Sequence, residues 1–136
     1  MKKFDQKNLQ AQLLPFFAKY RSELIAVYLF GSVADGTASA TSDIDIAILL
    51  RNPDKQSIGS LRFNLYADLS RALERNDIDL VILNMSGNLI LNDQITRHGI
   101  VLYAADASEN ERIDFELKVM HRCTDFKLQR YRVMGV

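Results

Sequence analysis

The chain has 136 residues, of which 48% are apolar, and this length suits one domain with an apolar core. Its 17 Lys and Arg residues balance its 17 Asp and Glu residues, so the formal net charge is zero. A neutral chain lacks the positive excess typical of proteins dedicated to nucleic acids or anionic membranes. The single cysteine, Cys123, excludes an internal disulfide and favours a reducing, cytoplasmic location.

The N-terminal segment predicts an interrupted helix. Residues 4–20 favour a helix that Asp5 can cap. Pro15 has no amide hydrogen, so we expect it to kink this helix or to start a second one. The start of the chain lacks the apolar run of a signal peptide, and no stretch reaches the roughly 18 apolar residues of a membrane span.

Two apolar strands frame the most informative stretch. Residues 24–30, LIAVYLF, predict a buried strand that ends at Gly31, and residues 43–50, DIDIAILL, predict a second strand. Residues two apart in a strand point to the same face at a spacing of about 6.6 Å, so Asp43 and Asp45 face one way. The residues that then face the opposite way, into the core, are Ile44, Ile46 and Ile48.

Paired carboxylates at the start of a core strand favour a metal site. They repel each other and are costly to desolvate unless a cation lies between them. Sites for phosphoryl and nucleotidyl transfer use such pairs to hold two metal ions roughly 3.5–4 Å apart. Asp79 begins a third predicted strand, residues 78–83, which could lie beside the second. Its carboxylate could reach the same ions or accept a proton from an attacking hydroxyl.

Gly31 and Ser32 favour a phosphate site between the first two strands. Gly31 has no side chain, so a phosphate can approach the backbone, and Ser32 can cap a short helical turn. Amides at the start of such a turn point outward and attract anions. Each feature alone is also typical of an ordinary turn or cap, whereas the combination favours catalysis.

The remaining elements alternate along the chain. Residues 57–77 predict the clearest helix, with Ser57 as its cap, and residues 88–98 predict a helix that stops at Gly99. A short strand at 100–103 and a last helix from about 108 to 130 complete the chain. This order predicts an α/β (α+β) fold with helices packed on a mostly buried sheet.

The stretch from Gly31 to Asp45 has the pattern G-S-x(10)-D-x-D and resembles the nucleotidyltransferase superfamily with a DNA-polymerase-beta-like fold. With GTASATSDIDIAIL, DIDLVIL and TRHGIVLY, the chain looks most like the minimal nucleotidyltransferases, the antitoxins of HEPN/MNT toxin–antitoxin pairs. The resemblance covers about residues 20–105 of a single predicted domain, residues 1–136. It implies a mixed sheet of about four strands flanked by helices.

The resemblance also implies roles for the residues of the motif. Gly31 and Ser32 would bind the nucleotide phosphates, Asp43 and Asp45 would bind magnesium, and Asp79 would be the third catalytic and metal-binding carboxylate. Two Mg²⁺ ions and ATP as substrate are expected. Many members carry a basic residue at the position of Asp35, where this chain has an acid.

We therefore expect a Mg²⁺-dependent protein adenylyltransferase that moves AMP from ATP to a hydroxyl, a tyrosine, of a HEPN ribonuclease toxin encoded nearby. The segments outside the core are too short to enclose a small substrate, and the balanced charge disfavours a nucleic-acid acceptor. Two alternatives remain open: a small-molecule (antibiotic) nucleotidyltransferase, and an antitoxin that acts by binding alone.

The last predicted helix adds a further candidate surface. Residues 109–118 hold two basic and four acidic side chains, whereas residues 119–136 hold four basic and one acidic. Apolar and aromatic residues lie among the later bases, so this end is either a partner or dimer surface or a loosely ordered terminus. His98 and His121 lie outside the acidic motif and are assigned no catalytic role.

Overall fold

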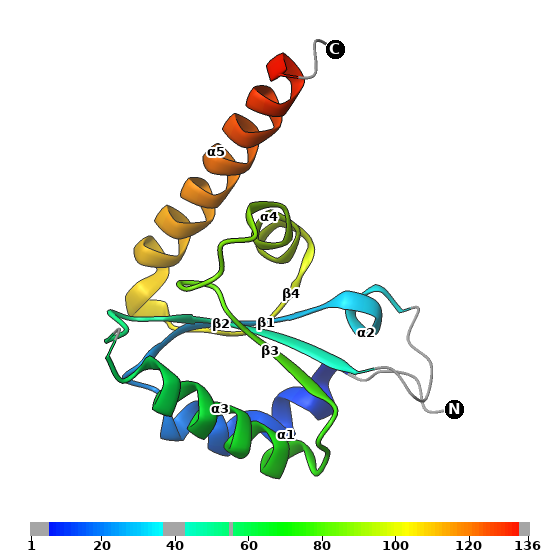
Figure 1. The fold of residues 1–136 in the computed structure, drawn as a ribbon. Helices are drawn as coiled ribbons and strands as arrows, with labels where there is room; N and C mark the ends of the chain where they lie inside the picture. Colours follow the sequence, from blue (N-terminus) through cyan, green and yellow to red (C-terminus); the bar gives the residue numbers. More distant parts are fainter. Residues whose placement is uncertain (1–5, 37–42, 55, 134–136) are drawn as a thin grey trace.

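The computed structural model describes residues 6–36, 43–54 and 56–133 (Figure 1). Its helices and strands follow the predicted order, and the cap expected at Asp5 lies outside the described residues. The helices are α1 (Gln6–Lys19), α2 (Gly31–Asp35), α3 (Ile58–Leu73), α4 (Leu89–His98) and α5 (Glu109–Val133), with a short 3-10 helix, η1 (Asp106–Ser108), before α5. The strands are β1 (Leu24–Phe30), β2 (Ile44–Leu50), β3 (Ile78–Ile82) and β4 (Ile100–Ala104).

The strands form one mixed sheet in the order β3-β2-β1-β4. Strand β1 is antiparallel to both β2 and β4, whereas β2 and β3 run parallel. The predicted α/β (α+β) class with a four-stranded mixed sheet is therefore confirmed, and β3 does lie beside β2. The parallel pair positions the site, because it brings the first residues of β2 and β3 to the same end of the sheet.

The two faces of the sheet are covered by different helices (Figure 1). Helices α1 and α3 cover one face, and α4 and α5 lie over the other. Alternate residues of β2 serve the two faces: Ile46 and Ile48 join the core under α1 and α3, and Leu49 joins a smaller core under α4. The isoleucines thus face the core as expected, which leaves the opposite face of β2 for Asp45.

Helix α1 differs from the prediction at Pro15. We expected either a kink or the start of a second helix there; no second helix starts, since α1 runs from Gln6 to Lys19 as one helix with Pro15 inside it. Leu13, on one side of the proline, and Phe16, on the other, are both buried in the same core. Burying large side chains on both sides offsets the roughly 3 kcal/mol that a proline costs inside a helix.

Helix α5 is attached to the sheet at its first half and extends away from it at its second (Figure 1). The hydroxyl of the fully buried Tyr28 donates a hydrogen bond to Glu116 at 2.7 Å, and Arg112 pairs with Glu116 at 3.3 Å. Burial, and then the bond to Glu116, raise the pKa of Tyr28, so its hydroxyl stays protonated as a donor. Cys123 is a free, buried cysteine. Neither α5 nor any other helix in the described part of the chain is both long and apolar enough to cross a membrane.

Candidate active site

The connection from β1 into α2 depends on a glycine. Gly31 has a φ of +76°, a conformation that residues with a side chain rarely adopt, and α2 begins at this residue. We expected Ser32 to cap α2, and this prediction is wrong. Phe30 is the N-cap and Ser32 lies inside the first turn, because the strand passes directly into the helix at Gly31.

Asp45 and Asp79 occupy neighbouring positions on parallel strands. The register places Asp45 of β2 beside Asp79 of β3 on one side and beside Phe30 of β1 on the other. Residues paired in register share a face of the sheet, so both carboxylates lie on the α4 face. Asp43, which is exposed, directly precedes Ile44, the first residue of β2. The three acids predicted from the sequence are therefore brought to one end of the sheet.

Repulsion among these acids alters the ionisation of Asp45. Partial burial raises the pKa of Asp45 above its ordinary value, and the charges of Asp79 and Asp43 raise it further. Arg75 follows α3, and its guanidinium forms an ion pair with Asp77. This pair raises the pKa of Arg75, and the charge of Asp43 makes a smaller contribution in the same direction. The cluster consequently carries an excess of negative charge that a bound cation would neutralise.

Gly31 and Asp45 are in direct steric contact across the β1–β2 pair. A Cβ added to Gly31 would lie 1.9 Å from the Oδ2 atom of Asp45 and 2.9 Å from its Cγ. No side chain can be accommodated at that distance unless the carboxylate moves. The absence of a side chain at residue 31 therefore makes room for the Asp45 carboxylate, in addition to any room that it leaves for a phosphate.

The donor set at this end of the sheet fits magnesium. Asp43, Asp45 and Asp79 offer only carboxylate oxygens, the hard ligands that Mg²⁺ prefers, and their mutual repulsion favours a divalent cation. Within the three described ranges, no three His, Cys, Asp or Glu side chains converge as a ready-made metal site. The carboxylates would therefore have to close further around a cation.

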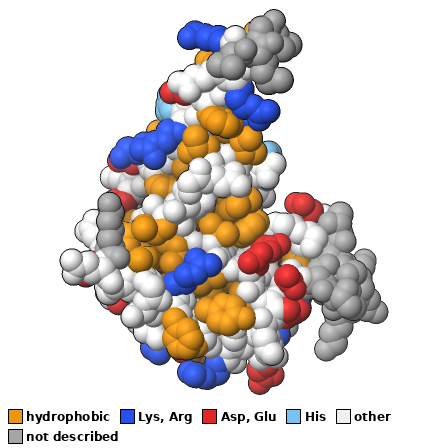
Figure 2. All heavy atoms as spheres, in the orientation of Figure 1, with side chains coloured by type: hydrophobic (Ala, Val, Ile, Leu, Met, Phe, Trp, Pro, Cys, Tyr) orange, Lys and Arg blue, Asp and Glu red, His pale blue; other side chains and the backbone are white. Residues whose placement is uncertain are grey.

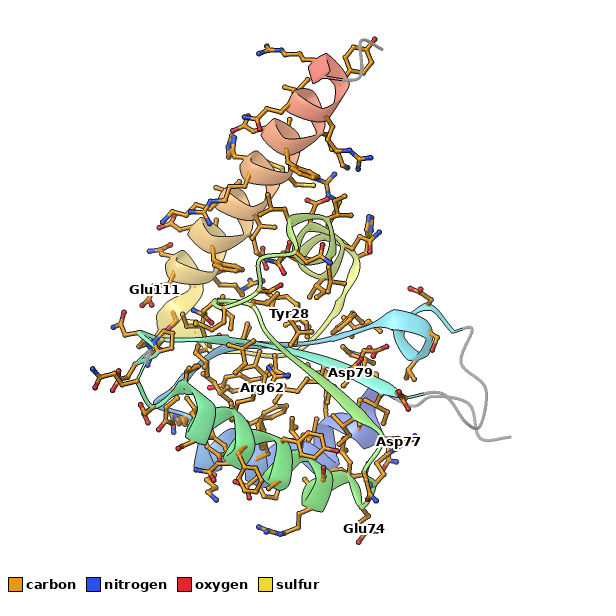
Figure 3. All side chains as sticks on the ribbon, viewed as in Figure 1. Tyr28, Arg62, Glu74, Asp77, Asp79 and Glu111 are labelled. Atoms are coloured by element: carbon orange, nitrogen blue, oxygen red, sulfur yellow. The ribbon has the colours of Figure 1, made fainter. Side chains whose placement is uncertain are left out.

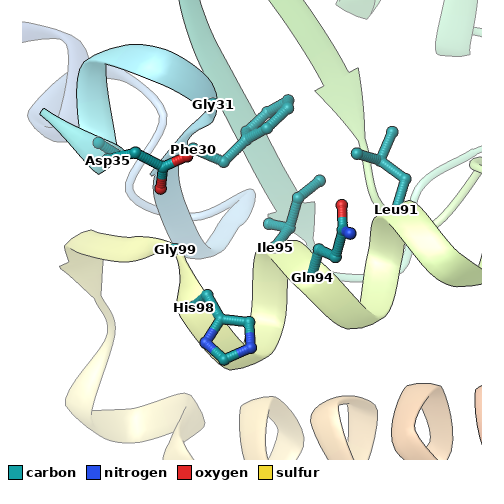
Figure 4. Close-up of a pocket in the computed structure, with 9 residues that line it drawn as sticks. Phe30, Gly31, Asp35, Leu91, Gln94, Ile95, His98 and Gly99 are labelled. Atoms are coloured by element: carbon teal, nitrogen blue, oxygen red, sulfur yellow. The ribbon is translucent and has the colours of Figure 1, made fainter. Parts of the chain in front are cut away.

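A pocket of about 410 Å³ lies between α2 and α4 and reaches Gly31 (Figure 4). It is lined by Phe30, Gly31, Ala34, Asp35, Leu91, Gln94, Ile95, His98 and Gly99. His98, to which the sequence assigned only a place at the end of a helix, thus lines a space that also reaches the Gly31 turn. Asp35 lines the α2 side of this space, where its negative charge disfavours a phosphate.

A second pocket, of about 390 Å³, lies at the β3 edge of the sheet and includes Asp79. Its other lining residues are Gly59, Arg62, Phe63, Tyr66, Ile78 and Leu80. Arg62 donates a hydrogen bond to the Leu80 carbonyl oxygen at 2.7 Å. The pocket residues from α3 are spaced three and four apart, so they share one side of the helix, away from its buried leucines. This spacing is a sequence signal that could have identified the pocket.

The sequence model of the family "Polymerase beta, Nucleotidyltransferase" matches residues 11–108, which is well over half of the chain. The chain therefore belongs to the polymerase beta nucleotidyltransferase family. The residues that it contributes to the end of the sheet include the paired acids and the glycine turn from which nucleotidyl transfer was expected.

One protein of similar sequence and two solved structures of similar fold show which members of this family the chain resembles. The chain is 34% identical over 88 residues to the protein adenylyltransferase MntA of Shewanella oneidensis, a match that covers 64% of this chain and 59% of that protein. The fold is similar to that in a crystal structure of a toxin–antitoxin with AMP-PNP, with a TM-score of 0.72, 26% identity, and coverage of 93% of this chain and 95% of that chain. A structure of the toxin–antitoxin MntA–HepT shares the fold, with a TM-score of 0.67, 23% identity, and coverage of 95% and 96%.

Proposed function

We propose that this protein is a Mg²⁺-dependent adenylyltransferase antitoxin. It transfers AMP from ATP to a hydroxyl, a tyrosine side chain, of a partner HEPN ribonuclease toxin encoded nearby, and thereby neutralises it. The 34%-identical relative is named as a protein adenylyltransferase, and the 26%-identical solved structure is described as a toxin–antitoxin with AMP-PNP. The cytoplasm, where the lone cysteine would stay reduced, is the proposed location.

The observation that carries this proposal is the row formed by Gly31, Asp45 and Asp79. The three residues come from the end of β1, from β2 and from β3, which are adjacent strands in the sheet. Asp45 lies against Gly31 on one side and beside Asp79 on the other. A triphosphate on the glycine turn would therefore extend toward the acids, where charge develops during transfer.

The residues of the chain have separate tasks in this reaction. Backbone amides at Gly31 and Ser32 bind the terminal phosphates, and Asp43, Asp45 and Asp79 hold the magnesium. When bound, Mg²⁺ neutralises phosphate charge and lowers the pKa of the acceptor hydroxyl. Asp79 accepts the hydroxyl proton. The hydroxyl oxygen forms a bond to the α-phosphorus as the bond from that phosphorus to the bridging oxygen breaks, and pyrophosphate leaves with the electron pair.

The experiment that tests the proposal uses ATP labelled at the α-phosphate. The full chain is incubated with labelled ATP, Mg²⁺ and the HEPN-type protein encoded beside it, and mass spectrometry locates the label. We expect AMP on a tyrosine of the partner, lost with Asp43→Asn and retained with Asp54→Asn. Asp54 is a suitable control because it is exposed and follows β2, whereas Asp43 precedes it.

Other outcomes distinguish the alternatives. Labelling of an aminoglycoside, with none on the partner, would replace the proposal with a small-molecule nucleotidyltransferase. Inhibition of the partner by both wild type and Asp43→Asn, without any label, would instead establish an antitoxin that acts by binding alone.

A further inference from the structure

The direction of transfer across the sheet follows from the row of site residues. In-line displacement places the attacking and leaving oxygens on opposite sides of the phosphorus. If pyrophosphate leaves at the glycine turn, beyond β1, the acceptor must approach from the side of Asp79 on β3. Strand β3 is an edge of the sheet, so this side is not covered by another strand of the sheet in the described structure.

The pocket of about 390 Å³ opens at this edge and shares Asp79 with the candidate site. Phe63 of α3 is 71% exposed there, although a large aromatic side chain gains most from burial. The hydroxyl of Tyr66 donates to the Asn76 carbonyl oxygen at 2.6 Å, and Arg62 is fixed to Leu80. The exposed Phe63 ring therefore projects from a helix that is fixed to Leu80 of β3 and to Asn76, shortly before β3.

We infer that this α3–β3 pocket is the docking surface for the acceptor polypeptide, a segment that carries the tyrosine to be modified. The inference rests on the proposed function and names the surface that recognises its protein substrate. Aromatic and arginine side chains are the commonest anchors of protein interfaces. Phe63 offers a ring face to an incoming aromatic side chain, and the pocket borders Asp79 at the open β3 edge, around which the acceptor tyrosine would reach the acids.

Charge at this edge specifies the segment further. Asp79 is exposed on β3, and Glu74 is exposed at the end of α3, in the connection that leads through Asp77 to β3 (Figure 3). Figure 2 shows the same arrangement from outside: exposed apolar side chains over α3, with acidic side chains gathered next to them. Because Asp77 is already paired with Arg75, the acids that a Lys or Arg near the tyrosine would complement are Glu74 and Asp79, and such complementarity raises the rate of association.

Other surfaces fit the acceptor less well. The pocket between α2 and α4 includes Gly31 but not Asp79, so it lies on the side from which pyrophosphate leaves. Exposed apolar residues of α5, such as Leu128 and Tyr131, belong to the half of that helix that extends away from the sheet (Figure 1). They could bind a partner, but they do not present a hydroxyl to the row of acids.

Two substitutions alter the pocket in opposite ways. Phe63→Ala removes its most exposed ring, and Gly59→Leu adds a side chain to its lining. Phe63 is exposed and a Cβ at Gly59 meets nothing within 4 Å, so we expect both variants to fold. We expect each to raise the KM for the partner protein by about tenfold or more. Stabilisation by Mg²⁺ and ATP should not change. The matched controls are Tyr131→Ala, a similarly exposed ring, and Gly87→Leu, a similarly open glycine.

The results separate the failure of this inference from the failure of the proposed function. Wild type that labels the partner, together with unchanged KM in Phe63→Ala and Gly59→Leu, would overturn the docking surface alone. A larger loss with Tyr131→Ala than with Phe63→Ala would overturn it in favour of α5. Wild type that binds Mg-ATP but never labels the partner would overturn the proposed function and this surface with it.

A cross-linking experiment gives a readout independent of turnover. A photoreactive benzoylphenylalanine at position 63 should cross-link to the partner next to its modified tyrosine, and the same probe at position 131 should not. Cross-links from position 131 alone would contradict the inference.

Discussion

The two faces of the sheet differ in what they leave exposed. The face under α1 and α3 is closed by a continuous apolar core to which Leu13, Leu65 and Ile48 contribute. The face under α4 has a smaller core, around Tyr28 and Ile95, that ends before the first residues of β2 and β3. At that end the exposed positions belong to acids, so one face supplies stability and the other supplies chemistry.

Strand β2 contributes to both faces by simple alternation. Ile44 and Ile46 point into the closed core, and Asp45, between them, points to the open end of the other face. A rigid strand buried on one side holds a carboxylate more precisely than a loop would. The comparison predicts that substitutions on the open face alter chemistry and those on the closed face alter stability.

The largest expected effect is a loss of chemistry without a loss of stability. Asp45→Asn should lower AMP transfer by at least about a thousandfold, because it removes a charged metal ligand. The melting temperature of the metal-free protein should not fall, since the substitution also removes repulsion from Asp79 and Asp43. Transfer and melting temperature are measured on the same preparation. A folded variant with near-normal transfer would refute the role of Asp45.

The next largest expected effect is a loss of stability without a loss of ATP binding, from a substitution on the closed face. Leu65 is fully buried on α3, and Leu65→Ala should lower the free energy of unfolding by about 2–5 kcal/mol through lost burial and the cavity left behind. Phe63→Ala on the same helix should change it little. Denaturant titration gives both values, while KM for ATP at a temperature where both variants are folded should stay close to wild type. A changed KM would mean that the two faces are coupled.

Substitutions at two glycines distinguish the cost of a left-handed backbone from the cost of a steric clash with Asp45. Gly31 and Gly36 both have a φ of 76°, but only at Gly31 would a Cβ meet Asp45. Gly36→Ala should cost about 1 kcal/mol of stability from the left-handed backbone. Gly31→Ala should cost at least about twice as much and should also weaken Mg-ATP binding, because Asp45 must move. Equal effects in thermal melts and ATP titrations would show that the contact with Asp45 is unimportant.

The smallest effect concerns pH. Because the pKa of Asp45 is raised in the folded state, its ionisation favours unfolding, and the metal-free protein loses some stability as pH rises above about 4. The melting temperature of Asp45→Asn minus that of wild type should therefore be near zero at low pH and positive at neutral pH. Screening at this partly exposed site limits the corresponding difference in the free energy of unfolding to less than about 1 kcal/mol. A negative difference at neutral pH would show that Asp45 has a stabilising partner.

The strands were predictable because their signal is local. Seven consecutive apolar residues identified β1 from Leu24 to Phe30, and the predicted second strand differs from β2 only at Asp43. The alternation of acids and isoleucines also predicted which side of β2 faces the core. These features depend on neighbours in sequence, so the sequence is sufficient to predict them.

The features that were missed depend on contacts between distant segments. Helix α1 continues through Pro15 because residues on both sides pack into one core. Gly99 ends α4 as predicted, but the sequence did not show why a glycine is needed there: its backbone is extended, and a Cβ would meet the carbonyl oxygens of Ile95 and Leu29 at 2.5 and 3.2 Å. The contact of Gly31 with Asp45 and the pocket beside Phe63 likewise require the tertiary structure. Sequence spacing alone does not contain this information.

The most direct test of the account is whether Mg²⁺ and nucleotide bind together at the row of acids. Thermal melts of the full chain are recorded with Mg²⁺, with a non-hydrolysable ATP analogue, and with both. We predict that the pair together stabilises wild type by roughly 2.7 kcal/mol at a hundredfold excess over Kd, which is more than the sum of the shifts with the separate ligands, and that Asp43→Asn loses this gain while Asp54→Asn keeps it. No shift in wild type, or an equal shift in Asp43→Asn, would contradict the account.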